Sequence, residues 1–507
     1  EDVAARFAAQ GWRVSKVPLA GDGEVDVAGL DTALSQSTPG QAQSPHLVMV
    51  RSHIAWPAPH AFDTSAAHGA PLGAEETAAT KTLLGVAQEA FTVDGAALDF
   101  ARQAEARGRG LHRAWDEAMD AWSRRRPDLA TRWRAAMDRV MPADLDERLL
   151  ALARAHPVGD SVSTRDASHA AIQVVAAALP ELLGGSADLS EPNRTTITNG
   201  GALLPANTPG ACPAGRNIHW GVREHAMTAA MNGLVLAGGV RAFSGTFLAF
   251  SDYQRPAIRL AALMGLPAIY VWTHDSIAVG QDGPTHQPIE QLASLRAMPG
   301  LAVLRPADAQ ETAAAWGVAI RRDGPTGLVL SRQPVAVLDA DPVLVAQGVR
   351  RGAYTVSDEA EPDAILIGTG SEVALAIKAA ESLRAAGRRV RVVSMPSREI
   401  FRAQPAEYRE SVLPGHSVKV VVEAASPFGW GDVVGVGGEV VGIDRFGASG
   451  SAADLAQAFD MTADAVVTAA ERALSRQGHS DRSRRPDSGT VAPARPPKLQ
   501  TPIEIER

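Results

Sequence analysis

Between residues 157 and 334 the sequence alternates between two kinds of segment, and this alternation constrains the fold more than any other feature. Stretches rich in alanine, such as SHAAIQVVAAALPELL and EHAMTAAMNGLVLAG, have the apolar spacing of helices. They alternate with the short apolar runs PAIYVW, LAVLRP and TGLVLSR, which have the length and composition of buried strands. The pattern predicts a parallel sheet covered by helices, and therefore an α/β fold.

A second α/β unit is predicted between about residues 349 and 474. The strand 364–367, the turn GTGSE and a helix that begins at Val373 precede another strand at 389–395, which makes one right-handed βαβ unit. The GTGSE turn invites comparison with a dinucleotide-binding fingerprint. However, Val373 stands where the GxGxxG pattern requires a small residue, so we do not predict nucleotide binding there. A serine-hydrolase motif GxSxG does not occur in the sequence.

The length of the chain requires several domains. A single core seldom grows past roughly 250 residues, and the chain has 507. Shifts in composition predict a first α/β segment at 1–94, a charged helical connection at 95–156, a sheet domain at 157–335, a second one at 348–474 and a disordered tail at 475–507. The chain also begins inside a helix and without methionine, so we expect upstream sequence to be missing.

Charge and cysteine content exclude some classes of partner. A net charge of −8 argues against a broad basic surface for nucleic acid. The longest apolar stretches fall short of the roughly 20 residues that a membrane span needs. The single cysteine, Cys212, fits a reducing compartment. We therefore expect a cytoplasmic protein with no nucleic-acid or membrane partner.

The segment THDSIAVGQDGPTHQP follows a predicted strand at 266–272. It therefore lies at a carboxyl end of the sheet, where α/β proteins collect their ligands. Its candidate binding residues are His274, Asp275, Asp282 and His286. Two other interpretations stay open: ordinary turn chemistry, or a metal site, although the paired spacing of structural zinc sites is missing.

Two arginines occupy positions suited to an anion. Arg165, in STRDASHAA, is predicted just before a helix whose N-cap is Asp166 or Ser168, so its guanidinium and the free backbone N–H groups could clamp a phosphate together. Arg332, in LVLSRQP, ends a predicted strand. Arg165 alone could equally form a surface ion pair. The two arginines together suggest a phosphorylated small molecule.

Three further residues have a structural explanation as well as a functional one. His68, in AHGAPLG, lies in a glycine-bounded loop where a backbone can approach a ligand closely. Asp188, in GGSADLSEPN, follows a strand and a glycine turn, as a capping residue would. Glu224, in WGVREHAM, lies in the first turn of a predicted helix, where the helix dipole alone explains a carboxylate.

Six separate blocks of the sequence resemble transketolases: THDSIAVGQDGPTHQPIEQLASLR, WGVREHAM, GGSADL, SGTFLAFSDY, LSRQ and GIDRFGASG. The resemblance covers nearly the whole chain to about residue 474. It implies three-layer, parallel-sheet domains of the thiamine-diphosphate-binding fold and a Rossmann-like C-terminal domain. Segment 1–94 would be the remnant of the diphosphate-binding domain, and 157–335 would be the pyrimidine-binding domain.

The resemblance also implies an activity. Transketolases are homodimers that use thiamine diphosphate and Mg²⁺ to transfer a two-carbon ketol unit from a ketose phosphate to an aldose phosphate, in the pentose phosphate pathway. Glu224 would bind the aminopyrimidine ring of the cofactor, because a carboxylate there favours the imino tautomer that accepts the proton of the thiazolium carbon. Phe247, Phe250 and Tyr253 would pack on that ring, and Asp188 would lie at the dimer interface near the cofactor.

The substrate roles follow from the same resemblance. His286 and His68 would contact donor hydroxyls and assist proton transfer, and His68 would also lie close to the diphosphate. Asp282 would bind the C2 hydroxyl of the acceptor. Three residues would hold the sugar phosphate: Arg165, His274 and Arg332.

The chain departs from the family pattern in three places. The GDG…N loop that holds Mg²⁺ and the diphosphate lies upstream of the region that resembles the family, so no metal ligands are predicted in this chain. Pro192 replaces a serine that binds the sugar phosphate, and Gln281 replaces a glutamate. We therefore expect the chain alone to be nearly inactive. The alternatives are 1-deoxyxylulose-5-phosphate synthase, dihydroxyacetone synthase, and a non-catalytic or split-enzyme subunit.

Overall fold

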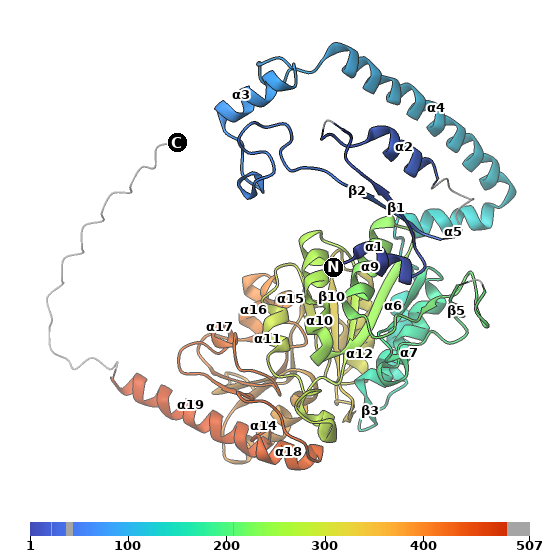
Figure 1. Ribbon diagram of the computed structural model, residues 1–507. Helices are drawn as coiled ribbons and strands as arrows, with labels where there is room; N and C mark the ends of the chain where they lie inside the picture. Colours follow the sequence, from blue (N-terminus) through green and yellow to red (C-terminus); the bar gives the residue numbers. More distant parts are fainter. Residues whose placement is uncertain (22, 37–43, 206, 484–507) are drawn as a thin grey trace. The chain divides into compact units, whose positions relative to one another are not determined.

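The computed structural model describes residues 1–21, 23–36, 44–205 and 207–483 (Figure 1). These residues form two compact units, Glu1–Arg125 and Arg126–Arg507. Across the described ranges, none of the helices combines the length and the apolar character that crossing a membrane would require. The segment predicted as a helical connection, 95–156, contains three helices, and the boundary between the two units falls inside it.

The first unit is built on a small parallel sheet. Strand β1 (Arg13–Val17) pairs in register with β2 (His46–Val50), which confirms the strand predicted from HLVMV. The flanking helices α1 (Val3–Ala9) and α2 (Val27–Ser35) begin where Asp2 and Asp26 accept hydrogen bonds from backbone N–H groups. The unit continues through η1 (Ser65–Ala67), α3 (Ala74–Leu83) and α4 (Gly95–Arg125).

The second unit contains the sheet predicted from the alternating pattern. Seven parallel strands lie in the order β5-β6-β4-β7-β8-β10-β9. Their bounds are β4 Leu182–Ser186, β5 Ala202–Leu203, β6 Asn217–Ile218, β7 Arg241–Phe247, β8 Ile269–Thr273, β9 Ala302–Leu304 and β10 Thr326–Leu330. Alternate residues of β8 enter different cores: Ile269 and Val271 enter one, and Tyr270 and Trp272 enter the other.

Each face of this sheet is covered by helices, which confirms the α/β prediction. One core includes residues of α6 (Leu145–Arg154), α7 (Thr164–Ala178), α12 (Ala309–Arg321) and α13 (Pro342–Arg351). The other includes residues of α9 (Glu224–Ala237), α10 (Ser251–Leu263) and α11 (Gln291–Arg296). In addition, β3 (Ser161–Ser163) and β11 (Pro334–Ala336) form a short antiparallel pair.

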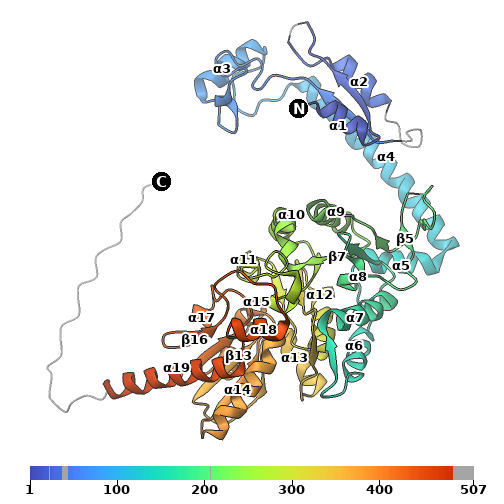
Figure 2. The same cartoon turned by 60° about the horizontal axis from the view of Figure 1, so that its bottom comes forward.

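A second sheet of five strands has the order β12-β14-β13-β15-β16. Strands β13 (Ala364–Gly368) and β14 (Val390–Ser394) are parallel and joined through α14 (Val373–Ala385), which confirms the predicted strand–helix–strand unit. Helices α14 and α19 (Ala463–Ser483) pack side by side on this sheet (Figure 2). The remaining strands are β12 Tyr354–Ser357, β15 Val418–Val422 and β16 Glu439–Val441.

The remaining helices are short. They are α5 Pro127–Met137, α8 Ser190–Asn193, η2 Leu248–Phe250, η3 Ile277–Asp282, η4 Gly370–Glu372, α15 Arg398–Arg402, α16 Ala406–Val412, α17 Gly431–Val434 and α18 Ala452–Ala458.

Three local predictions were wrong. The helix predicted through ALPELL ends at Ala178, because Pro180 disfavours helical geometry at the preceding residue, and β4 begins at Leu182. Arg165 does not precede its helix but lies in the first turn, since the N-cap is Ser163, whose hydroxyl accepts a hydrogen bond from the Asp166 N–H. Helix α19 continues past residue 474 to Ser483, with no proline before Pro486; the rest of the predicted tail lies outside the described residues.

Candidate functional site

The residues predicted to hold a sugar phosphate meet at one edge of the seven-stranded sheet. Strands β8 and β10 are neighbours, and Thr273 pairs with Leu330, so His274 and Arg332 leave the sheet side by side. Arg165 is tied to the same edge because its backbone N–H donates to Ser331 O at 3.4 Å. The parallel topology therefore brings Arg165, His274 and Arg332 together, and these three residues form what we call the phosphate corner.

The Arg165 side chain has one hydrogen-bond donor paired and another that could bind a ligand. Its Nη1 donates to the carbonyl of Pro192 at 2.9 Å. Its Nε is buried and has no hydrogen-bond partner among the described residues. Burial lowers the pKa of Arg165. Asp166 acts in the opposite direction, and the nearby charges of Arg194 and Arg332 lower the pKa further. An anion would relieve both the unpaired donor and the repulsion between cations.

His274 is held in a strained conformation in this corner. Its φ is 61°, in the left-handed region that β-substituted residues seldom adopt, and its exposed fraction is 3%. Its ring stacks on Phe247 with centroids 3.7 Å apart. Burial lowers the pKa of His274 to about 3, and Arg165, Arg332 and His286 add to the effect. The ring is therefore neutral near pH 7, and the positive charge of the corner comes from the arginines.

Two residues that the sequence did not single out orient His274. The Thr273 hydroxyl lies 2.8 Å from His274 Nδ1 and donates to Asn193 Oδ1 at 2.6 Å. Asn193 in turn donates to the Ser186 hydroxyl at 3.1 Å. All these side chains are buried. A polar residue in a fully buried strand such as β8 was the one sequence signal that could have drawn attention to Thr273.

The aromatic residues predicted to receive a cofactor ring form a cluster with His286. Phe247 and Phe250 stack with centroids 5.6 Å apart, and His286 contacts Phe250 edge-on at 5.3 Å. Tyr253 lies 6.1 Å from Phe250 and is 64% exposed. Phe247 is the last residue of β7, Phe250 ends η2 and Tyr253 lies in the first turn of α10, so the cluster lies at the same sheet edge as the phosphate corner.

The segment 273–288 is fixed by the motif GIDRFGASG. Gln287 donates to the carbonyls of Gly280 and Ala448, each at 2.9 Å. Gly283 has a φ of 77°, and a Cβ there would lie 2.5 Å from the Ser449 hydroxyl, so only glycine allows this approach. Asp282 and Gln281 remain exposed.

Glu224 is the first residue of α9 and is 9% exposed. Within the ranges that the structure describes, its carboxylate accepts no hydrogen bond. Its oxygens are not among the buried polar atoms that lack a partner, so water or a ligand can reach them. The site therefore fits a donor such as the protonated nitrogen of an aminopyrimidine ring. Asp188 is exposed just after β4, with a φ of 60°.

His68 belongs to the first unit, whereas every other predicted site residue belongs to the second. It is exposed and follows η1. Its contact with the others stays a prediction.

The structure does not support the alternative metal site. Where the chain is described, no three His, Cys, Asp or Glu side chains converge to hold a metal ion. Asp275 instead pairs with Arg305, with Oδ2 and Nη2 2.8 Å apart. The letters GDG occur at 21–23, but no asparagine follows before Asn193, so the GDG…N pattern is not completed there.

Comparison with known families gives three consecutive matches. Residues 1–142 match the thiamine diphosphate binding domain of transketolase, 160–336 its pyrimidine binding domain, and 352–462 the transketolase-like C-terminal domain. The chain is 46% identical to the transketolase of Mycobacterium bovis over 94% of its own length and 68% of that protein.

Solved structures agree with these matches. The transketolase of Pichia stipitis in complex with sedoheptulose 7-phosphate is 34% identical, with a TM-score of 0.86, over 94% of this chain and 69% of that one. A split-gene transketolase, described as an inactive β4 tetramer, is 25% identical with a TM-score of 0.52, over 62% of this chain and 99% of that one. Sequence, fold and three domain matches thus agree, and the chain belongs to the transketolase family.

Proposed function

We propose that this chain carries the pyrimidine-binding and sugar-phosphate-binding parts of a transketolase that transfers a two-carbon ketol unit between sugar phosphates. The observation that carries the proposal is the corner where Arg165, His274 and Arg332 meet, with the buried Arg165 Nε unpaired among the described residues. The sugar phosphate bound in the related Pichia stipitis enzyme supports this substrate class.

The residues at the sheet edge divide the work by their chemistry. The arginines would neutralise the phosphate, and neutral His274 would add a hydrogen bond without charge. His286, beside the aromatic cluster, would take or return a proton of a donor hydroxyl. Asp282 would bind the C2 hydroxyl of the acceptor. His68, a residue of the first unit, would contact donor hydroxyls. Thiamine diphosphate would supply the carbanion-stabilising chemistry. Glu224 would hold its aminopyrimidine ring, and Phe247, Phe250 and Tyr253 would exclude water around it.

Replacing Arg332 by methionine tests the phosphate corner. A charge-assisted hydrogen bond contributes about 1.5–3 kcal/mol, so the Kd for a ketose phosphate should rise roughly 10- to 150-fold. The Kd for the same ketose without phosphate should not change. Titration calorimetry of this chain measures both. Arg350→Met, at an exposed arginine paired with Asp146, is the matched control. An unchanged Kd in Arg332→Met would refute the assignment.

We also propose that the diphosphate and Mg²⁺ are held by residues outside this chain, and that the chain alone turns over substrate very slowly. The uncompleted GDG…N pattern supports this, because an unpaired diphosphate needs a metal ion and a backbone cradle. The related split-gene protein, described as inactive, is consistent with it. We propose that the complete enzyme is a homodimer, as the resemblance to the family suggests. A cytoplasmic location is proposed as well, and the single free Cys212 is consistent with it.

Calorimetry with thiamine diphosphate and Mg²⁺ tests the cofactor proposal. The chain should show no binding in the micromolar range. A Kd of micromolar or below would mean that residues of this chain do hold the diphosphate. Thiamine without phosphates is the control, because its binding would depend on the region around Glu224 alone.

A further inference from the structure

We propose that the GTGSE turn of the C-terminal sheet, Gly368–Glu372, acts through Arg305 as a positioning device for the phosphate corner. The inference rests on the proposed function of that corner. It assigns a role to a turn that resembled a nucleotide-binding motif in the sequence, and to Arg305, which no sequence pattern singled out.

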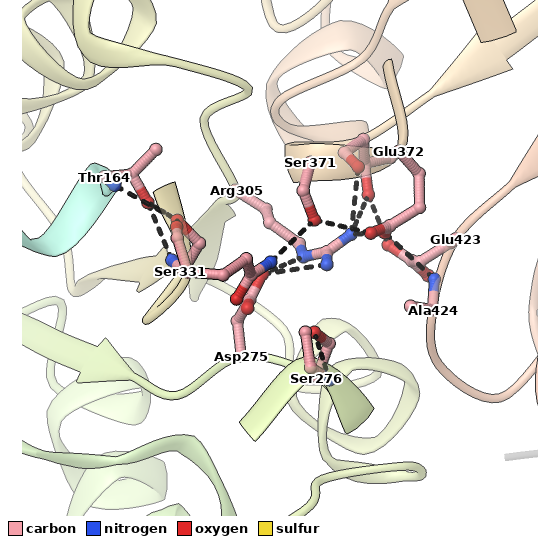
Figure 3. A network of polar contacts seen from close by, with 12 residues as sticks. Thr164, Asp275, Ser276, Arg305, Ser331, Ser371, Glu372, Glu423 and Ala424 are labelled. Atoms are coloured by element: carbon pink, nitrogen blue, oxygen red, sulfur yellow. Dashed lines mark hydrogen bonds and ion pairs between the residues drawn. The ribbon is translucent and has the colours of Figure 1, made fainter. Parts of the chain in front are cut away.

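Arg305 lies at the centre of a buried network that joins the two sheets of the second unit (Figure 3). It follows β9, and its side chain is 0% exposed. Its Nη1 donates to the carbonyl and to the hydroxyl of Thr369, at 2.9 and 3.0 Å, and also contacts the Glu372 carboxylate. On its other side, Nε donates to Asp275 Oδ2 at 3.0 Å. Burial acts to lower the pKa of Arg305, but the carboxylates of Glu372, Asp275 and Glu423 together outweigh burial and raise it.

The backbone of the turn is shaped to receive this guanidinium. Gly370 has a φ of 55°, and a Cβ there would lie 2.7 Å from Arg305 Cζ. The glycine is therefore required for the approach of an arginine side chain. This explains the GTGSE pattern without a nucleotide.

The network reaches each residue of the phosphate corner through its neighbour in sequence. Asp275, held by Arg305, directly follows His274. Gln333, which directly follows Arg332, donates to the Ser371 hydroxyl at 3.3 Å, and Ser371 donates to Glu372 at 2.6 Å.

The third connection runs to Arg165. The preceding Thr164 exchanges two hydrogen bonds with Ser331: the Ser331 N–H donates to the Thr164 hydroxyl at 2.7 Å, and the Thr164 N–H donates to the Ser331 hydroxyl at 3.1 Å (Figure 3). Ser331 directly precedes Arg332. Arg165, His274 and Arg332 are thus attached to one framework.

The framework is anchored in the C-terminal sheet. The Glu423 carboxylate accepts from the Thr369 hydroxyl at 2.7 Å and pairs with Arg296 through two hydrogen bonds of 2.8 Å. The backbone N–H of Ala424 donates to Glu372 at 2.9 Å. Water cannot take the place of a lost partner at these buried charges, so one arrangement of the side chains is strongly favoured over others. A left-handed His274 needs surrounding structure of this kind to hold it.

Replacing Glu372 by glutamine tests the proposal, because it removes the charge opposite Arg305 and keeps the shape. Calorimetry of this chain should show a Kd for a ketose phosphate about tenfold or more above that of the unchanged chain, since a small displacement of binding groups costs this much or more. The Kd for the ketose without phosphate should not change. A merely structural role would reduce the bound fraction for both ligands alike.

Glu311→Gln is the matched control. Glu311 is also buried between the two sheets and accepts hydrogen bonds from Tyr354, Ser394 and the Ala307 N–H, at 2.9, 2.6 and 2.7 Å. None of these donors is a sequence neighbour of the corner residues. Its variant should leave the ratio of the two Kd values unchanged. If Glu372→Gln gives the same ratio as Glu311→Gln, the proposal is overturned.

A structure of Glu372→Gln without ligand separates this proposal from the proposed function. We expect His274 to leave its left-handed φ, or Arg332 to move with Gln333. If both stay in place, the positioning role is refuted, whatever the affinity. If the unchanged chain binds no ketose phosphate, the proposed function fails, while the structure of the variant still decides the positioning role.

Discussion

Glutamine at position 224 should lower kcat by about 10²- to 10⁴-fold, which is the range that a positioned proton-transfer group contributes. The amide keeps the size of Glu224 but cannot stabilise the protonated ring nitrogen of a bound aminopyrimidine. The measurement is steady-state turnover with thiamine diphosphate and Mg²⁺, in a form that also carries the diphosphate-binding and metal-binding segment. Affinity for the cofactor should fall less than kcat, because most of its contacts remain.

The same substitution should leave the stability of the cofactor-free chain nearly unchanged. Glu224 is 9% exposed, but its oxygens are not among the buried polar atoms that lack a partner, so its charge keeps contact with water and its removal changes little. Asp464→Asn, in the first turn of α19, controls for the loss of a favourable helix-dipole interaction. A variant that loses activity and stability in parallel would indicate a structural role instead.

Glutamine at position 423 should lower the free energy of unfolding by about 3–5 kcal/mol, since breaking a buried ion pair leaves a charge without compensation. The side chain of Glu423 is 1% exposed and that of Arg296 is 4% exposed. The carboxylate also accepts from Trp430 Nε1 at 3.0 Å. Denaturant unfolding measures the change, with Glu471→Gln as the control. Its pair with Arg388 is exposed and should contribute about 0–1 kcal/mol.

The contribution of Glu423 should also depend on pH. Burial acts to raise the pKa of Glu423, but Arg296, Arg305 and the hydrogen bond from Thr369 together outweigh burial and lower it to about 2. The folded state therefore holds this proton less tightly than the unfolded state, in which the pKa is near 4.5. Stability from Glu423 is present in full above pH 4.5 and is lost as pH falls toward 2. Equal acid sensitivity in Glu423→Gln and in the unchanged chain would contradict this.

Much of the fold could be read from local pattern. The apolar runs before His274 and Arg332 are strands β8 and β10, and the rule that parallel strands end at one edge places both residues in one corner. The prediction through ALPELL was wrong because the apolar pattern was given more weight than Pro180. The resemblance to transketolases agrees with the family matches across three domains.

The residues that hold the phosphate corner in place could not be predicted from local sequence patterns. Arg305 and Glu372 are 67 positions apart, and Thr273 and Asn193 are 80 apart. Nothing in the short stretches around them distinguishes a buried arginine with two carboxylate partners from an exposed one.

The sequence alone thus determined the α/β class, the family and which residues lie at the strand ends, because hydrophobic periodicity and motifs act over a few neighbouring residues. The tertiary structure decided which charges are buried, which pairs compensate them and how His274 is held in a left-handed conformation. These properties depend on desolvation and on partners from distant segments, which come together only when the two sheets of the second unit pack.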